Sequence, residues 1–207
     1  MRTGTLLKLV LTLAGCVLFS SVQAAGNAEN GKFKFATCVG CHGIPGYTNV
    51  YPTYHVPRLG GQHAEYLVIA LKAYQAGDRK HPTMHANAQL SEQDMADIAA
   101  YVAKLPPYAE EHPPVKGNAE AGQKKAEVCA ACHGKDGNGV KEAPNPTFPR
   151  LAGQHEDYLR KALQDYKSGE RKNAIMSGMA QPLTEQDQAD LAAYFASREK
   201  GLSVAKE

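Results

Sequence analysis

Apolar positions repeat with the period of an α-helix in two segments of the chain. Each segment carries three apolar residues within about one helical turn: Ile98, Tyr101 and Val102 in one, Leu191, Tyr194 and Phe195 in the other. Polar residues surround both sets, so each segment predicts an amphipathic helix with one buried face. Both begin with a motif that resembles a capping box with Asp in place of Glu, Ser91-x-x-Asp94 and Thr184-x-x-Asp187.

Helix signals elsewhere give each half the same set of elements. Asn27 and Asn118 are good N-caps for a first helix. Middle helices are predicted over residues 63–75 and 155–167, and Gly77 and Gly169 follow as plausible C-caps. No strand pattern competes with these helices. The predicted fold class is therefore all-α, with a few helices and long loops in each half.

The sequence contains an internal repeat. "GNAENGKFKFATCVGCHG" (26–43) matches "GNAEAGQKKAEVCAACHG" (117–134), and "PRLGGQHAEYL" (57–67) matches "PRLAGQHEDYL" (149–159). The matches keep their order and are shifted by 91 to 93 residues, which indicates a tandem duplication. A proline-rich connector over 105–117 separates the copies. We expect two domains, residues 25–112 and 113–207.

Each copy carries a C-x-x-C-H motif, Cys38/Cys41/His42 and Cys129/Cys132/His133. Two cysteines at this spacing can bond covalently to the two vinyl groups of a haem, and the following histidine can ligate the iron. A redox dithiol usually accompanies a βαβ pattern, and a zinc site usually has its two cysteine pairs closer together. These two alternatives are disfavoured but not excluded by the sequence. We predict two covalently attached haem c groups.

A second axial ligand is expected for an electron-transfer haem. Met84 and Met176 lie five residues after equivalent arginines, Arg79 and Arg171, and both copies retain methionine at this position in a predicted loop. The alternative is that both methionines fill the core. In the first half, His81 or His85 could replace Met84.

Several neighbours are candidates to support these ligands. The carbonyls of Pro57 and Pro149 could accept the second ring N–H of the axial histidines. Charged hydrogen bonds to haem propionates could come from four further side chains: Arg58, Arg150, Gln62 and Gln154. Plain surface solvation is the alternative for the arginines. His63 and His155 are interpreted as helix-start caps rather than ligands.

The first 24 residues predict a secretory signal cleaved after Ala24. A retained membrane anchor and a lipidated Cys16 in "LAGC" are the alternatives. Cleavage would remove Arg2 and Lys8 and so cancel the formal net charge of +2. A neutral chain argues against nucleic-acid binding. The expected location is the periplasm, with peripheral membrane association at most.

These motifs together resemble the dihaem cytochrome c4 family. The resemblance rests on the two C-x-x-C-H motifs, "PRLxGQ" and "L[ST]EQDxAD[IL]AAY", and it extends over residues 26–200. It implies two class I cytochrome c domains related by a pseudo-twofold axis. It also implies haem one on Cys38, Cys41, His42 and Met84, and haem two on Cys129, Cys132, His133 and Met176. In such domains the first and last helices cross at a small residue against an aromatic, here Gly31 with Tyr101 and Gly122 with Tyr194.

The family resemblance implies an electron carrier, not an enzyme. Such a carrier passes single electrons between redox proteins, with a haem–copper terminal oxidase as the expected acceptor. One alternative is the dihaem subunit of a periplasmic dehydrogenase, such as flavocytochrome c sulfide dehydrogenase. A dihaem peroxidase is disfavoured because both predicted iron sites have two protein ligands.

Overall fold

Helices make up the regular structure of the computed structural model, which describes residues 25–51, 53–106, 114–141 and 144–206. The first half contains five helices: α1 (Ala28–Phe35), α2 (Val39–His42), α3 (Ala64–Ala76), α4 (Pro82–Asn87) and α5 (Glu92–Lys104). The second half repeats them: α6 (Ala119–Lys125), α7 (Ala130–His133), α8 (Glu156–Ser168), α9 (Ala174–Ala180) and α10 (Glu185–Ala196). Pairing between extended residues is limited, in the described ranges, to isolated bridges. The all-α prediction is confirmed. The predicted signal segment with Cys16, and the predicted boundary at 112/113, lie outside the described residues.

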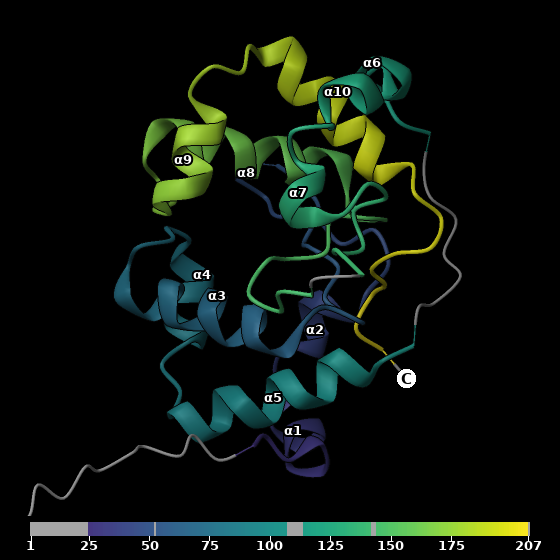
Figure 1. Cartoon of the computed structure of the whole chain (residues 1–207). Coiled ribbons are helices and arrows are strands. Elements are labelled where there is room, and N and C mark those ends of the chain that lie inside the picture. Colours follow the sequence, from purple (N-terminus) through teal and green to yellow (C-terminus); the bar gives the residue numbers. More distant parts are fainter. Residues whose placement is uncertain (1–24, 52, 107–113, 142–143, 207) are drawn as a thin grey trace, which may run out of the picture.

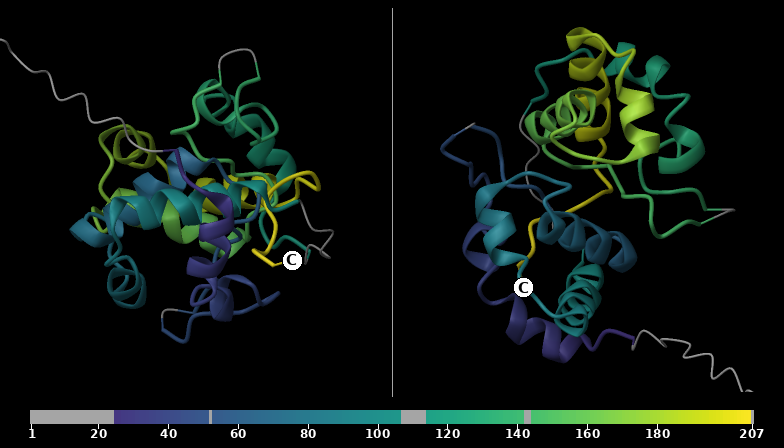
Figure 2. Two further views of the ribbon diagram at one scale, coloured as in Figure 1. Left: turned by 90° about the horizontal axis from the view of Figure 1, so that it is seen from below. Right: turned by 90° about the vertical axis from the view of Figure 1, so that its left-hand side faces the viewer.

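The two halves have the same internal packing (Figure 1). In the first, α5 packs against α1 and α3, and α4 packs against α3. In the second, α10 packs against α6 and α8, and α9 packs against α8. Figure 2 shows the halves as two bodies, with the C-terminal segment running from the second body onto the first.

The predicted helix ends agree with the structure. The side chains of Asn27 and Asn118 accept hydrogen bonds from backbone N–H groups of α1 and α6. Gly77 and Gly169 end α3 and α8 in the left-handed conformation, with φ of 76° and 84°. The middle helices begin and end one residue later than predicted. Thr184 and Asp187 form a full capping box.

A glycine allows the first and last helices of each half to touch. A Cβ on Gly31 would overlap the carbonyl oxygen of Asp97 and lie 2.9 Å from Cβ of Tyr101. A Cβ on Gly122 would overlap the carbonyl oxygen of Asp190 and lie 2.8 Å from Cβ of Tyr194. The predicted crossings of Gly31 with Tyr101 and of Gly122 with Tyr194 are therefore confirmed.

A buried carboxylate fastens each crossing. Asp97 is 1% exposed, accepts from the N–H of Asn27 at 2.8 Å and pairs with Lys34 at 2.6 Å. These hydrogen bonds hold the pKa of Asp97 at about 2, with Lys34 the largest cause. Asp190 makes the equivalent contacts with Asn118 and Lys125. The first helix, which leads into the C-x-x-C-H motif, is thereby fixed to the core.

We predict that Gly31→Ala destabilises the protein by about 1–3 kcal/mol, because the added methyl group cannot fit without moving α1 away from α5. The measurement is the free energy of unfolding of the holoprotein in urea. Gly40→Ala is the matched control: a Cβ on Gly40 meets nothing within 4 Å, and the second copy has Ala131 at this position. Equal stability of the two variants would contradict the close crossing.

Candidate haem-binding sites

Each C-x-x-C-H motif forms a single helical turn. Cys38 is the N-cap of α2 and Cys129 is the N-cap of α7, and the histidines His42 and His133 end these turns. The four motif cysteines are partly exposed, and no disulfide joins them. Burial raises the pKa of Cys38 and Cys129, so neither is the activated thiolate that a dithiol redox site requires.

The motif histidines are buried and oriented by a proline carbonyl. Nδ1 of His42 lies 3.0 Å from the carbonyl oxygen of Pro57, and Nδ1 of His133 lies 2.8 Å from that of Pro149. A carbonyl oxygen can only accept, so Nδ1 is the donor and Nε2 carries the lone pair. This arrangement confirms the predicted role of the two prolines and prepares each ring to ligate a metal through Nε2.

Burial also keeps the two rings neutral. Burial, with smaller contributions from the charges of Arg79 and His81, lowers the pKa of His42 to about 4. Burial likewise lowers the pKa of His133. A neutral imidazole is the form that binds iron.

Met84 and Met176 occupy short helices, α4 and α9, rather than the loops expected from the sequence. Each is the third residue of its helix, and its N–H bonds the N-cap side chain, His81 Nδ1 at 3.2 Å or Asn173 Oδ1 at 3.0 Å. The N-cap bonds explain the difference, because each satisfies an N–H group at the start of a short helix. Both methionines are partly buried at matching positions.

The alternative ligands in the first half have other contacts. His81 caps α4 through Nδ1, and its Nε2 lies 3.3 Å from Oδ1 of Asn49. His85 is exposed, and its Nδ1 lies 2.9 Å from the carbonyl oxygen of Tyr74. Among the other methionines, Met95 is 1% exposed in the core and Met179 is partly buried in α9. These contacts favour Met84 over both histidines.

The two glutamines expected to hold propionates instead join the two halves. Gln154 accepts from the N–H of Arg58 at 2.9 Å and donates to its carbonyl at 2.9 Å. Gln62 makes the same pair of bonds to Arg150, at 2.9 Å and 3.0 Å. Each amide thus pairs with the backbone of the opposite half as a strand neighbour would. This symmetry is the clearest sign of the pseudo-twofold relation.

The arginines do not lie free on the surface. Arg58 is 3% exposed, and its Nη1 donates to the carbonyl oxygen of Gly153. The Nε of Arg150 is buried and has no hydrogen-bond partner among the described residues. A buried guanidinium nitrogen without a partner is costly, so Arg150 fits a site that brings its own acceptor, as a haem propionate would.

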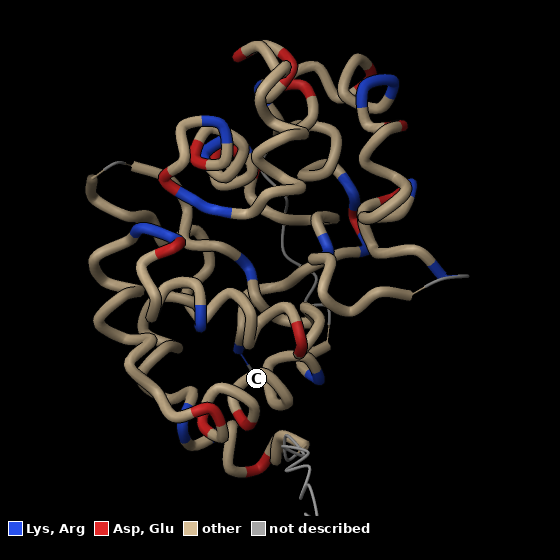
Figure 3. Tube along the Cα trace, turned by 60° about the vertical axis from the view of Figure 1, so that its left-hand side comes forward, with Lys and Arg blue, Asp and Glu red and all other residues tan. Residues whose placement is uncertain are grey.

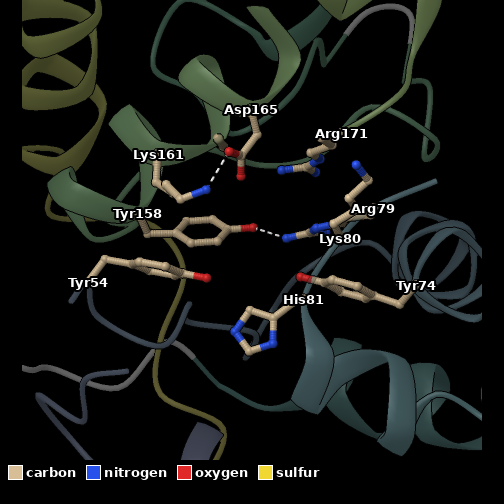
Figure 4. A pocket seen from close by; sticks show the side chains of 10 residues that line it. Tyr54, Tyr74, Arg79, Lys80, His81, Tyr158, Lys161, Asp165 and Arg171 are labelled. Atoms are coloured by element: carbon tan, nitrogen blue, oxygen red, sulfur yellow. Dashed lines mark hydrogen bonds and ion pairs between the residues drawn. The ribbon is translucent and has the colours of Figure 1, made fainter. Parts of the chain in front are cut away.

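A second arginine pair, Arg79 and Arg171, was missed in the sequence. The two lie on facing segments, each is 8% exposed, and they form an antiparallel bridge. Arg79 donates to the hydroxyl of Tyr158 and lies 4.4 Å from the ring centre of Tyr74. Arg171 donates to the hydroxyl of Tyr66 at 2.7 Å. Figure 4 shows Arg79 and Arg171 on one side of a pocket, with Tyr54, Tyr74 and Tyr158 around it.

The signal for this cluster was present in the repeat. Both copies have the arginine, in "AGDRK" (76–80) and "SGERK" (168–172). Both copies also have two tyrosines at equivalent positions, Tyr66 with Tyr158 and Tyr74 with Tyr166. Burial raises the pKa of Tyr166 to about 12 and raises that of Tyr74 further. Burial acts in the same direction on Tyr66, but Arg171 and Arg79 outweigh it and lower its pKa. The cluster therefore holds two buried cations among tyrosine side chains from both halves.

The histidines before α3 and α8 are N-caps by position only. His63 and His155 make no side-chain capping bond. His155 instead stacks on His55, with 4.7 Å between ring centres, and Nδ1 of His55 lies 2.7 Å from Asp157. These contacts again join the two halves, and they replace the predicted capping role.

The family model that matches the chain is "Cytochrome c", over residues 28–106 and 119–199. The cytochrome c4 of Pseudomonas aeruginosa is 52% identical over 89 residues, 43% of this chain and 42% of that protein. This match spans less than half the length of that relative. Cytochrome c-552 of Acidithiobacillus ferridurans is 31% identical over 95% of this chain and 87% of its own length.

Solved structures give the same result. Cytochrome c4 of Acidithiobacillus ferrooxidans has a TM-score of 0.68 and 32% identity, covering 79% of this chain and 99% of that one. Thiosulfate dehydrogenase TsdBA of Marichromatium purpuratum has a TM-score of 0.70 and 32% identity, over 82% of this chain and 40% of that one.

A further relative by sequence is a thiosulfate dehydrogenase electron acceptor of Thiomonas intermedia, which is 45% identical over 71 residues, 34% of this chain and 31% of that protein.

We predict that Gln154→Ala weakens the contact between the halves, because it leaves the N–H and carbonyl of Arg58 without partners. The expected loss is about 1–3 kcal/mol for each unsatisfied group that stays buried. Urea unfolding followed by circular dichroism measures it. Gln123→Ala, at an exposed position, is the control and should behave as the wild type. If Gln154→Ala did the same, the amide pairing would not stabilise the interface.

Proposed function

This chain belongs to the cytochrome c4 family of dihaem c-type cytochromes, and from that premise we propose that it is a periplasmic electron carrier in respiration. It is a dihaem electron-transfer cytochrome with two tandem cytochrome c domains and two covalent haem c groups. Its donor, its acceptor and its location are our proposal. A terminal oxidase of the haem–copper class is the proposed acceptor, and the secretory pattern of residues 1–24 supports the periplasm.

The proposed ligand sets follow the matched geometry of the two halves. Cys38 and Cys41 hold the first haem, with His42 and Met84 as axial ligands. Cys129 and Cys132 hold the second, with His133 and Met176. Bound iron supplies one-electron redox chemistry at each site. The observation that carries the proposal is the pair of oriented, neutral histidines, each donating Nδ1–H to a proline carbonyl.

The protein residues set the properties of these sites. Thioether ligands favour the reduced state more than a second imidazole does. Buried cations have the same effect, because a nearby positive charge disfavours the more highly charged oxidised site. Burial lowers the pKa of both histidines, and the charge of Arg79 acts in the same direction on His42. We therefore propose that the two sites differ in reduction potential.

The surface is compatible with transient partners. Acidic and basic residues alternate over both domains in Figure 3, and the net charge is small. Among the helices that the structure describes, none is both long and apolar enough to cross a bilayer.

A dedicated acceptor subunit of a dehydrogenase is the second candidate. The matches to a thiosulfate dehydrogenase electron acceptor and to a thiosulfate dehydrogenase structure favour it. Native size-exclusion chromatography of the periplasmic fraction separates the two candidates. A free carrier elutes alone, whereas a subunit elutes with a dehydrogenase at fixed stoichiometry.

We predict that Met84→His and Met176→His each abolish half of the near-infrared absorption that marks Met–Fe(III) ligation. Each should also lower one of two one-electron reduction steps, because imidazole favours the oxidised iron relative to a thioether. Spectroelectrochemical titration of the holoprotein measures both effects.

Met179→Leu is the matched control for this experiment, since Met179 is a partly buried methionine on the same helix as Met176. It should keep the full absorption. Loss of the band in Met179→Leu, or full retention in Met84→His, would overturn the ligand assignment. Fast peroxide turnover by the wild type would overturn the carrier function itself.

A further inference from the structure

The segment that follows α10, residues 201–206, leaves the second domain and packs on the first (Figures 1 and 2). It is deeply buried there: Leu202, Ser203, Val204 and Ala205 are 1–3% exposed. Ala205 belongs to the hydrophobic core of the first domain, with Phe35 and Leu67 among its neighbours in that cluster. This burial is unusual for a segment beyond the last helix.

Three backbone hydrogen bonds fix the segment beside the first C-x-x-C-H motif. The N–H of Ala205 donates to the carbonyl of His42 at 2.9 Å, and the carbonyl of Ser203 accepts from the N–H of Gly60 at 2.9 Å. Gly60 in turn accepts from the N–H of Ser203 at 3.1 Å, and the hydroxyl of Ser203 donates to the carbonyl of Pro106. A residue of the second domain thus bonds directly to the backbone of His42 in the first site.

The second domain makes the equivalents of two of these bonds, the one to the histidine carbonyl and the one from the N–H of Gly60, within its own chain. The carbonyl of His133 accepts from the N–H of Gly139 at 2.8 Å, and the N–H of Ala152 donates to the carbonyl of Gly137 at 3.1 Å. In the repeat, His133 corresponds to His42 and Ala152 to Gly60. The donor and the acceptor lie two residues apart in both cases, at 137 and 139 or at 203 and 205.

A third contact follows the same correspondence. A Cβ on Gly134 would overlap the carbonyl oxygen of Gly139, and a Cβ on Gly43, the equivalent glycine, would lie 3.2 Å from the carbonyl oxygen of Ala205. Residues 203–205 therefore take the place in the first domain that residues 137–139 take in the second.

The first domain's own loop goes elsewhere. After Gly43 it forms a bridge between Thr48 and His55, and His55 then bonds Asp157 of α8 through its N–H at 3.0 Å. The ring of Tyr54 lies 6.3 Å from that of Tyr158. The first domain's loop thus contacts α8 of the second domain, and the segment after α10 contacts the first domain.

We propose that residues 203–205 are a positioning segment for the first haem site, donated by the second domain, and that this site is incomplete without them. Ala205 fixes the carbonyl of His42, and Ser203 fixes the loop that contains Pro57, the acceptor for the ring of His42. Removing the segment takes away the hydrogen bond to the backbone carbonyl of His42 and loosens the loop that holds its ring. It also admits water to the surroundings of this histidine. The second site keeps its own loop and does not depend on the segment.

Hydrogen exchange of the wild-type holoprotein tests the placement without any substitution. We expect the amide of Ala205 to exchange as slowly as the core amides of α5, because it is buried and bonded to the first domain. Exchange as fast as in an unfolded peptide would overturn the proposal.

Redox titration tests the functional part, which rests on the assignment of His42 as an axial ligand. The variants are a chain ending at Lys200 and the full-length Ala205→Pro, which removes the N–H that bonds His42. We expect the step assigned to the first site by Met84→His to fall in potential, and the other step to stay unchanged. Lys206→Arg, which keeps the positive charge and leaves the backbone bonds in place, is the control and should shift neither step.

The outcomes separate this proposal from the proposed function. Two unchanged steps, or two equal shifts, would overturn the positioning role, whereas a wild type without methionine-ligated iron would overturn the ligand assignment first. Amide exchange in residues 38–43 and 57–62 should be at least about tenfold faster in the truncated chain, and that in residues 129–139 unchanged. If the truncated chain does not accumulate, Ala205→Pro and the wild-type exchange still decide the question.

Discussion

Two buried guanidinium groups constrain how the halves of this protein can sit together. A buried cation must be hydrogen-bonded and must lie near polarisable or electron-rich groups, or its loss of hydration would outweigh the packing around it. Arg79 reaches a tyrosine of the second domain and Arg171 reaches a tyrosine of the first, so each domain supplies the partner that the other needs. Lys80 with Glu170 and Lys172 with Asp78 add ion pairs on the exposed side of the same bridge. The charge of Arg79 adds to the effect of burial in lowering the pKa of His42, and this connects the joining of the domains to the first site.

The interface also makes two similar domains unequal. The reciprocal amide pairs of Gln62 and Gln154 keep the pseudo-twofold relation. The segments around the C-x-x-C-H motifs break it, because the first histidine is supported from across the interface and the second is supported locally. Carriers that accept an electron at one end and release it at the other need this kind of difference. Here the difference arises because a segment of the second domain packs on the first site, although the same types of ligand are proposed for both sites.

Much of this architecture could be predicted from the sequence because the signals are local. Helix caps, the glycine crossings and the C-x-x-C-H turns depend on residues a few positions apart, and the duplication supplied each of them twice. The proline carbonyls were predicted from the needs of a ligating imidazole. The roles of Gln62, Gln154 and Arg79 could not be predicted in this way, because their partners lie in the other copy. A buried glutamine beside a C-x-x-C-H motif fits a propionate as well as it fits a distant backbone, and only the docked halves distinguish the two.

The bond between Ala205 and His42 has a consequence for how the protein is made. Synthesis delivers the first C-x-x-C-H motif well before residues 203–205, and domains generally fold in the order in which they emerge. The first domain cannot follow that order to completion, since part of its core arrives with the second. Its cysteines and histidine therefore stay accessible until residues 203–205 have been made. This delay leaves time for a cofactor to be attached, and the late closure of a long loop then locks it in place.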